Sequence, residues 1–269
     1  MTALASPLSL ILERALANDQ IEHALFCTFT FDAGYFERVA LGPLDGVGAQ
    51  VTVVADAAMA KLDPYAARRI GSRYGLGLVH HGGAFHPKVA VLLGRDTCTV
   101  AIGSGNVTMA GWHANEELWT SVESDADDWS PFTSAVGRWL QGLSDSAQVG
   151  PRVASHLASI GRRLDRPPTG STIDTPSALG NLQQPIIEQL PTGPVDELNV
   201  YAPFHGHGAD AIRSLCERLE PELLRVGYQP GSTMLNPGAV GKYLESLAVS
   251  VELRALDPAR YRHGKLIEW

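Results

Sequence analysis

The strongest constraint on the fold is an order of elements that occurs twice along the chain. Each copy begins with an apolar strand, continues with a helix and two more strands, and ends on a segment that carries a His-x-Lys tripeptide. The first copy is expected at 23–31, 32–48, 49–56, 76–81 and 86–94, and the second at 195–204, 209–219, 222–228, 247–256 and 260–269. Alternating strands and helices in two similar sets predict an α/β fold built from two lobes, each a mixed β-sheet flanked by helices.

The first copy continues further than the second. A strand over 98–104, a helical segment from 106, a strand over 115–124 and a helix over 129–145 follow its tripeptide, and helices are also expected within 1–20 and over 63–75. A stretch rich in Pro, Ser, Thr and Gly separates the copies. We therefore expect a first lobe over 1–150, an interlobe connection over 151–192, and a second lobe over 193–269 that is truncated after its tripeptide.

Composition limits the class of protein. Of the 269 residues, 45% are hydrophobic and 19% charged, which is ordinary for a soluble globular chain. The formal net charge of -8 argues against general adhesion to nucleic acid or to a membrane, although it leaves room for a local basic cleft. Three widely separated cysteines, an N-terminus without a basic leader and no segment long enough to span a bilayer predict a cytoplasmic protein without disulfides.

The first tripeptide carries groups suited to phosphate chemistry. Residues two apart on a strand project from the same face, so His86 and Lys88 are expected to point together. An imidazole can attack phosphorus or donate a proton, and an ammonium group neutralises the phosphoryl oxygens. The hairpin that follows should bring Ser104 and Asn106 alongside, where a hydroxyl, an amide and backbone N–H groups can face the same anion.

These residues resemble the signature of the phospholipase D superfamily, which joins HxK, a hairpin, GSxN and an acidic residue. The chain supplies His86, Lys88, Gly103, Ser104, Asn106, Gly111, Asn115 and Glu117 at the corresponding places. The flanking sequences "FHPK" and "TFTFDAGYFERV" are most similar to the nuclease-type branch found in restriction, defence and helicase-associated proteins. The Asp of the lipid-hydrolysing members is absent, because Leu92 and Leu93 stand in its region.

The resemblance implies a nuclease that cleaves DNA at the interface of the lobes, without metal or cofactor. It makes His86 the nucleophile that forms a phosphohistidine and His263 the general acid. Lys88, Lys265 and Asn106 would hold the non-bridging oxygens, with Ser104 in support. Glu117 would orient one imidazole, and the sequence leaves open which one. The implied setting is a module of a bacterial defence, restriction or helicase-type protein, as a homodimer or in a larger assembly.

Other interpretations remain open. A second hypothesis is a catalytically silent module for nucleic-acid binding or assembly, which would explain a second copy without GSxN. A third hypothesis is a phospholipid phosphodiesterase. "FHPK" alone is also typical of a strand end, and Asn106 could simply cap a helix. The spacing of His80, His81, His86 and His113 matches no common zinc site.

Overall fold

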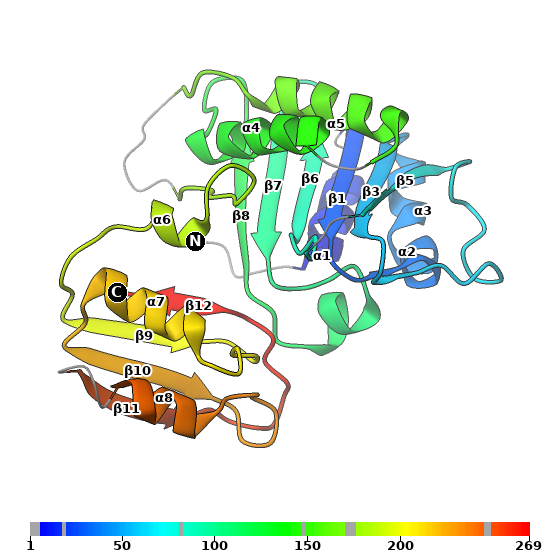
Figure 1. Ribbon diagram of the computed structural model, residues 1–269. Helices are drawn as coiled ribbons and strands as arrows, with labels where there is room; N and C mark the ends of the chain where they lie inside the picture. Colours follow the sequence, from blue (N-terminus) through cyan, green and yellow to red (C-terminus); the bar gives the residue numbers. More distant parts are fainter. Residues whose placement is uncertain (1–5, 18–19, 81–82, 147–148, 170–175, 245–248) are drawn as a thin grey trace. The chain divides into compact units, whose positions relative to one another are not determined.

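The structure is a computed structural model that describes residues 6–17, 20–80, 83–146, 149–169, 176–244 and 249–269 (Figure 1). The chain divides into two compact units. The first comprises Met1–Ala114 and Trp119–Leu182, and the second comprises Asn115–Leu118 and Gln183–Trp269. The short segment Asn115–Leu118 therefore belongs to the second unit, although residues of the first unit flank it on both sides.

The first unit is built on a six-stranded mixed sheet. Its strands follow the order β5 (Tyr74–Val79), β3 (Gln50–Asp56), β1 (His23–Thr28), β6 (Val89–Leu93), β7 (Cys98–Gly103) and β8 (Trp119–Ser124). The strands β5, β3 and β1 are parallel, whereas β6 pairs antiparallel with β1 and begins an antiparallel run through β7 and β8. This parallel core is what the repeated strand–helix pattern predicts.

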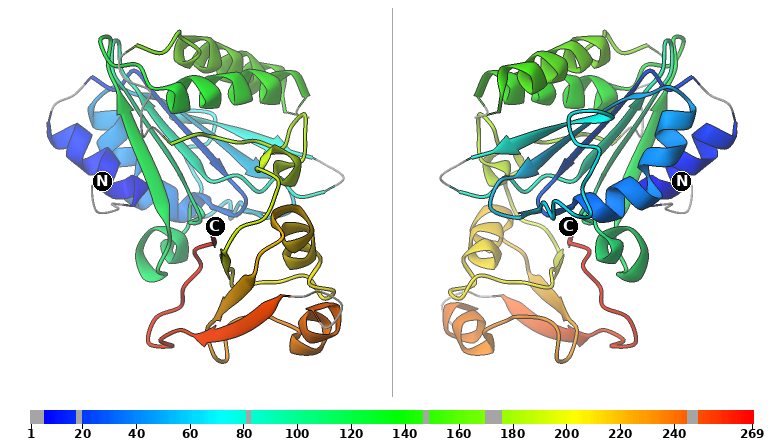
Figure 2. Two further views of the ribbon diagram at one scale, coloured as in Figure 1. Left: turned by 90° about the vertical axis from the view of Figure 1, so that its left-hand side faces the viewer. Right: turned by 90° about the vertical axis from the view of Figure 1, so that its right-hand side faces the viewer.

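Helices cover both faces of this sheet, as Figure 2 shows. One apolar cluster joins the sheet to α1 (Pro7–Leu16), α2 (Ala33–Val39) and α3 (Leu41–Gly46). The other joins it to α4 (Pro131–Ser146) and α5 (Pro151–Leu164). A strand covered on both faces needs apolar side chains on both, which is why β1 reads as a continuous buried run rather than an alternating one.

The second unit has a four-stranded sheet in the order β11 (Ser250–Ala255), β10 (Leu223–Tyr228), β9 (Glu197–Tyr201) and β12 (Leu266–Glu268). Burial alternates along β9 and β10, which indicates one apolar face. That face packs against α7 (Asp210–Leu219) and α8 (Pro237–Leu244), with α6 (Ile186–Gln189) beside the same cluster. The opposite face carries more polar side chains, among them Asn199 and Arg225.

The two sheets share one topology. The order β5-β3-β1-β6 in the first unit corresponds to β11-β10-β9-β12 in the second, with the same parallel and antiparallel pairings. The first residue of β6, Val89, pairs with Cys27 of β1, and the first residue of β12, Leu266, pairs with Tyr201 of β9. The predicted α/β fold with a duplicated strand order is therefore confirmed.

The helix expected over 63–75 is absent from the structure, and that prediction was wrong. The segment forms turns, because the Glu37 carboxylate accepts hydrogen bonds from the backbone N–H groups of Arg68 and Arg69 at 2.9 Å each. In a helix, those N–H groups would instead donate to backbone carbonyl groups of the preceding turn. Gly71, at φ +79°, adopts a left-handed conformation just before β5. A short pairing of β2 (Phe31–Asp32) with β4 (Ala60–Lys61) lies nearby in the sequence.

Three other boundaries differ from the expected ones. The strand expected over 115–124 begins at Trp119, and the helical segment expected from 106 is a π-helical turn, η1, over Ala110–Ala114. The stretch expected to connect the lobes holds the 14-residue helix α5, which is part of the first unit. The strands expected over 76–81 and 247–256 extend into residues outside the described ranges.

Helices α4 and α5 cross where each has a glycine. A Cβ on Gly137 would lie 2.6 Å from the backbone nitrogen of Asp165 and 2.8 Å from the carbonyl oxygen of Gly161. Backbone atoms cannot move aside as a flexible side chain can, so we expect Gly137→Ala to destabilise the protein by about 1–3 kcal/mol. The free energy of unfolding in urea measures this effect.

Gly142, on the same helix, is the matched control. A Cβ there would meet only a side-chain atom of Leu182, at 3.6 Å. Alanine has the higher helix propensity, so Gly142→Ala should leave stability unchanged or raise it by up to about 1 kcal/mol. Equal effects of the two substitutions would contradict the close helix crossing.

Candidate active site

The first HxK tripeptide lies in an extended segment that leads into β6. The strand expected to include His86 and Lys88 begins only at Val89. Pro87 has no N–H to donate to a ladder, and the Phe85 N–H donates to Asp56 Oδ2 at 2.9 Å instead of to a neighbouring strand. Strand-like contact resumes at Lys88, whose carbonyl accepts from the Gly103 N–H at 3.0 Å. This bond holds the tripeptide beside the start of the GSxN turn.

His86 and Lys88 nevertheless meet, as the sequence predicted. Lys88 is only 5% exposed, and its Nζ donates to His86 Nδ1 at 3.2 Å, whereas the imidazole itself is exposed. Phe29, the residue after β1, stacks on this pair. Its ring centroid lies 4.2 Å from that of His86, with the planes at 42°, and 5.6 Å from Lys88 Nζ. The aromatic face therefore holds both the imidazole and the ammonium group in place.

The GSxN turn is tied back to the end of β1. Asn106 Oδ1 accepts from the Thr30 N–H at 3.1 Å and from Thr28 Oγ1 at 3.4 Å. With the amide oxygen engaged there, the amide NH₂ is the donor left on the other side of the group. Gly111 permits this close turn, because a Cβ at that position would lie 2.3 Å from the Asn106 carbonyl oxygen. Ser104 is buried beside it.

In the second unit, the segment Asn115–Leu118 holds the second HxK tripeptide. The Glu116 N–H donates to the Tyr261 carbonyl at 3.0 Å, and the His263 N–H donates to the Glu116 carbonyl at 2.9 Å. Arg262 Nε donates to Glu116 Oε2 at 2.8 Å. The main chain around His263 is therefore fixed by a segment that lies nearly 150 positions earlier in the sequence.

Glu117 contacts the imidazole of His263. Its carboxylate oxygens lie 3.0 and 3.1 Å from His263 Nδ1, and its side chain is only 4% exposed. Asn115 Nδ2 donates to the same carboxylate at 3.2 Å. Lys265 Nζ donates to His263 Nε2 at 3.1 Å. A carboxylate on Nδ1 orients the ring and stabilises the imidazolium ion, so the geometry connects Glu117 with His263.

The charges in this cluster affect its lysine and tyrosine. Partial desolvation lowers the pKa of Lys265, and the nearby Glu117 carboxylate opposes that effect. Desolvation and the same carboxylate both raise the pKa of Tyr261. Lys265 therefore loses its proton at a lower pH than an ordinary lysine, while Tyr261 stays neutral to a higher pH than an ordinary tyrosine.

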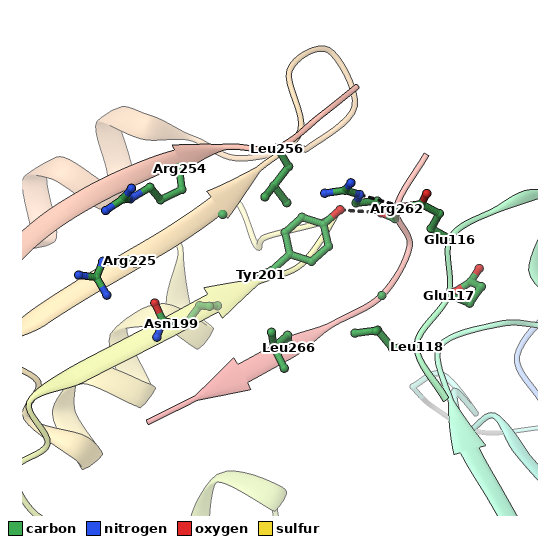
Figure 3. A pocket seen from close by; sticks show the side chains of 13 residues that line it. Glu116, Glu117, Leu118, Asn199, Tyr201, Arg225, Arg254, Leu256, Arg262 and Leu266 are labelled. Atoms are coloured by element: carbon green, nitrogen blue, oxygen red, sulfur yellow. Dashed lines mark hydrogen bonds and ion pairs between the residues drawn. The ribbon is translucent and has the colours of Figure 1, made fainter. Parts of the chain in front are cut away.

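A cavity of about 370 Å³ lies in the second unit, on the face of the sheet opposite α7 and α8 (Figure 3). Tyr201, Leu266 and Leu118 gather around its apolar part, and Glu117 and Gly264 belong to its wall. Its arginines are engaged: Arg225 pairs with Glu197 and Glu252, Arg254 with Glu252, and Arg262 with Glu116. These pairings neutralise the guanidinium groups, so the cavity is a poor match for a free anion.

The structure thus gathers the predicted site residues into two sets, one in each unit. His86, Lys88, Ser104 and Asn106 lie in the first, and Glu117, His263 and Lys265 lie in the second. Sequence reasoning missed Phe29, Asp56 and Thr28. The position of Thr28 and Phe29 at the end of the first strand is a signal that could have identified them. No local sequence pattern indicates that the Asp56 carboxylate accepts a hydrogen bond from the Phe85 N–H.

The described residues contain no helix long and apolar enough to cross a membrane. Among the same residues, no group of three or more His, Cys, Asp and Glu could hold a metal ion, and His81 lies outside the described ranges. Cys27, Cys98 and Cys216 are buried free thiols.

No family model matches the sequence, and no curated protein sequence matches it either. Among solved structures, the chain is similar to yeast tyrosyl-DNA phosphodiesterase, with 10% identity, a TM-score of 0.56, and coverage of 92% of this chain and 73% of that one. It is also similar to polyphosphate kinase from Porphyromonas gingivalis, with 10% identity, a TM-score of 0.52, and coverage of 97% and 40%.

A third structure, the phospholipase D family member Nuc from Salmonella typhimurium, is 15% identical, with coverage of 58% of this chain and 84% of its own and a TM-score of 0.30. The fold assignment rests on the first two structures, both of the phospholipase D superfamily. The chain therefore has the fold of that superfamily, which confirms the resemblance at the level of the fold.

The contact of Glu117 with the second HxK tripeptide can be tested by titration. Because a nearby negative charge favours the ammonium form, Glu117→Gln should lower the pKa of Lys265 below its value in the unsubstituted protein. NMR titration of the lysine side chain measures this shift. Glu116→Gln is the control, since the Glu116 side chain bonds Arg262 rather than the imidazole of His263, and it should leave the pKa of Lys265 unchanged. Equal shifts in both variants would contradict the specific role of Glu117.

Proposed function

We propose that the protein is a phosphodiesterase that cleaves DNA through a phosphohistidine intermediate. The observation that carries this proposal is the repeated placement of a His–Lys pair before equivalent strands. Lys88 Nζ lies 3.2 Å from an imidazole nitrogen of His86, and Lys265 Nζ lies 3.1 Å from one of His263. Two imidazoles and two ammonium groups are the groups that a two-step displacement at phosphorus needs.

In the first step, His86 attacks the phosphorus atom and the bond to the leaving oxygen breaks. Lys265 turns from His263 Nε2 to the phosphate oxygens, and His263, protonated on both nitrogens, gives its Nε2 proton to that leaving oxygen. The Glu117 carboxylate at His263 Nδ1 supports this role, because it stabilises the positive charge of the acid before transfer. Lys88 donates to His86 Nδ1, so the neutral imidazole carries its proton on Nε2. Attack through Nε2 therefore requires that Lys88 turns to the phosphate oxygens and that the imidazole, by exchange with water, loses the proton on Nε2 and gains one on Nδ1.

In the second step, neutral His263 takes a proton from water as the water oxygen attacks the phosphohistidine. The nitrogen–phosphorus bond breaks, and His86 returns to its starting form. Lys88, Lys265 and the Asn106 amide hold the non-bridging oxygens in both steps, with the Ser104 hydroxyl in support. The two ammonium groups supply the positive charge that a metal ion supplies in other nucleases, so the reaction is proposed to be metal-independent.

DNA as the substrate is supported by the nuclease-like flanks of the first HxK and by the name of the yeast protein with the similar fold, tyrosyl-DNA phosphodiesterase. The flanks also support a role as a module of a bacterial defence, restriction or helicase-type protein. The net charge of -8 implies that DNA contacts are confined to a limited surface. The buried free thiols suit a reducing, cytoplasmic compartment.

The proposal predicts DNA cleavage that persists in EDTA and is lost in His86→Ala. General acid–base or nucleophilic groups typically contribute at least about 10²-fold to rate, so the loss should be of that order or larger. Gel analysis of labelled oligonucleotides measures it. His80→Ala is the matched control, because His80 is an exposed histidine of the same unit and, among the described residues, makes no hydrogen bond to His86, Lys88, Ser104 or Asn106. Cleavage that requires a metal ion, or that survives His86→Ala, would refute the proposal.

The two histidines can be told apart with an aryl phosphodiester, whose leaving group needs no proton. His263→Ala should then complete the first step and stall before hydrolysis, because no base activates water. Mass spectrometry of the stalled protein should find the phosphoryl adduct on His86. An adduct on His263 in the His86→Ala protein would reverse the two roles.

A further inference from the structure

Each unit places a phenylalanine shortly after its first strand and beside its HxK histidine. In the first unit, Phe29 is half-buried and stacks on His86. In the second, Phe204 lies edge-on to His263, with ring centroids 6.3 Å apart and planes at 70°. Phe204 is 53% exposed. The two rings therefore differ in how much of their surface could contact a ligand. Phe29 already packs against the imidazole of His86, whereas a large part of Phe204 faces solvent.

Phe204 does not stand alone. Met234, which is 65% exposed, lies next to it through backbone bonds that join the two loops. The His205 N–H donates to the Met234 carbonyl at 2.9 Å, and the Met234 N–H donates to the Pro203 carbonyl at 2.8 Å. The two residues are thus exposed apolar neighbours, and the Phe204 ring lies beside His263. We call Phe204 and Met234 the apolar platform.

Gln229 holds this platform in place relative to His263. The glutamine is buried, and its Nε2 donates to the carbonyl groups of Asp257 and Arg260 at 2.9 and 2.5 Å. Its Oε1 accepts from the Arg262 N–H at 3.1 Å. Its backbone N–H donates to Thr233 Oγ1 at 2.7 Å, one residue before Met234. One residue thus links the platform loop, through its backbone N–H, to the residue that precedes His263, through its side chain.

We propose that the apolar platform stacks the nucleobase next to the cleaved phosphate, and that the substrate is therefore single-stranded DNA. This inference rests on the proposed function, because it takes Lys265 as a phosphate ligand. A nucleobase is joined to its phosphate through one sugar, so an aromatic ring beside His263 lies within reach of the adjoining base. Aromatic side chains are the usual platforms for unpaired bases, and a base in a duplex has both faces covered by its neighbours.

Binding measurements test this inference separately from catalysis. The protein carries His86→Ala so that DNA stays intact, and fluorescence anisotropy in EDTA follows a labelled single-stranded oligonucleotide. Loss of one stacked base weakens binding by about 5- to 150-fold, and we expect Phe204→Ala to increase Kd by that factor. Phe204→Trp should restore binding, whereas Phe204→Leu, which keeps the apolar volume without the aromatic face, should not.

Tyr65→Ala is the matched control, since Tyr65 is 83% exposed and its hydrogen bonds within the described part of the chain go to Asp63 and Arg68, outside both sets of site residues. It should leave Kd unchanged. Duplex DNA should bind more weakly than single strands and should be insensitive to Phe204→Ala. An unchanged Kd in Phe204→Ala, or an equal loss for single-stranded and duplex DNA, would overturn the inference. If binding follows the expected pattern but no DNA is cleaved by the unsubstituted protein, the proposed function fails while the platform stands.

Discussion

The arrangement of the site depends on one pairing, the antiparallel contact between the strand that follows each HxK tripeptide and the first strand of its unit. This pairing joins β6 to β1 and β12 to β9. It brings the tripeptide to the carboxyl end of the first strand, where the residues that leave the sheet can reach it. Phe29 meets His86 there, and Phe204 meets His263. The neighbourhood of each histidine therefore follows from strand register.

The same pairing places the two imidazoles in different surroundings. His86 has an ammonium group on Nδ1 and an aromatic face on its ring, while His263 has a buried carboxylate on Nδ1 and an ammonium group on Nε2. Both imidazoles contact an ammonium group, so the Glu117 carboxylate is the contact that distinguishes His263: it orients the ring and can stabilise an imidazolium ion formed during the reaction. Two copies of one motif can therefore divide acid and nucleophilic work between them.

Much of this arrangement could be predicted from the sequence, because strands, turns and the spacing of residues along a strand are determined by neighbouring residues. The repeated order of elements and the meeting of His86 with Lys88 follow from alternation and an i, i+2 spacing. Other features depend on distant partners. No local pattern connects Glu117 with His263, which lies 146 positions away. The helix expected over 63–75 does not form, because the Glu37 carboxylate accepts hydrogen bonds from two of its backbone N–H groups. The strand β6 begins later than expected, because Pro87 has no N–H to donate.

The segment Asn115–Leu118 gives the chain an unusual genetic property. It is encoded between two segments of the first unit yet belongs to the second unit, where it supplies Glu117 to His263 and pairs with Tyr261. A gene cut between the units, after Leu182, would separate His263 from its carboxylate. Although the two sheets share one strand order, recombination after Leu182 could not exchange the second unit without separating His263 from Glu117.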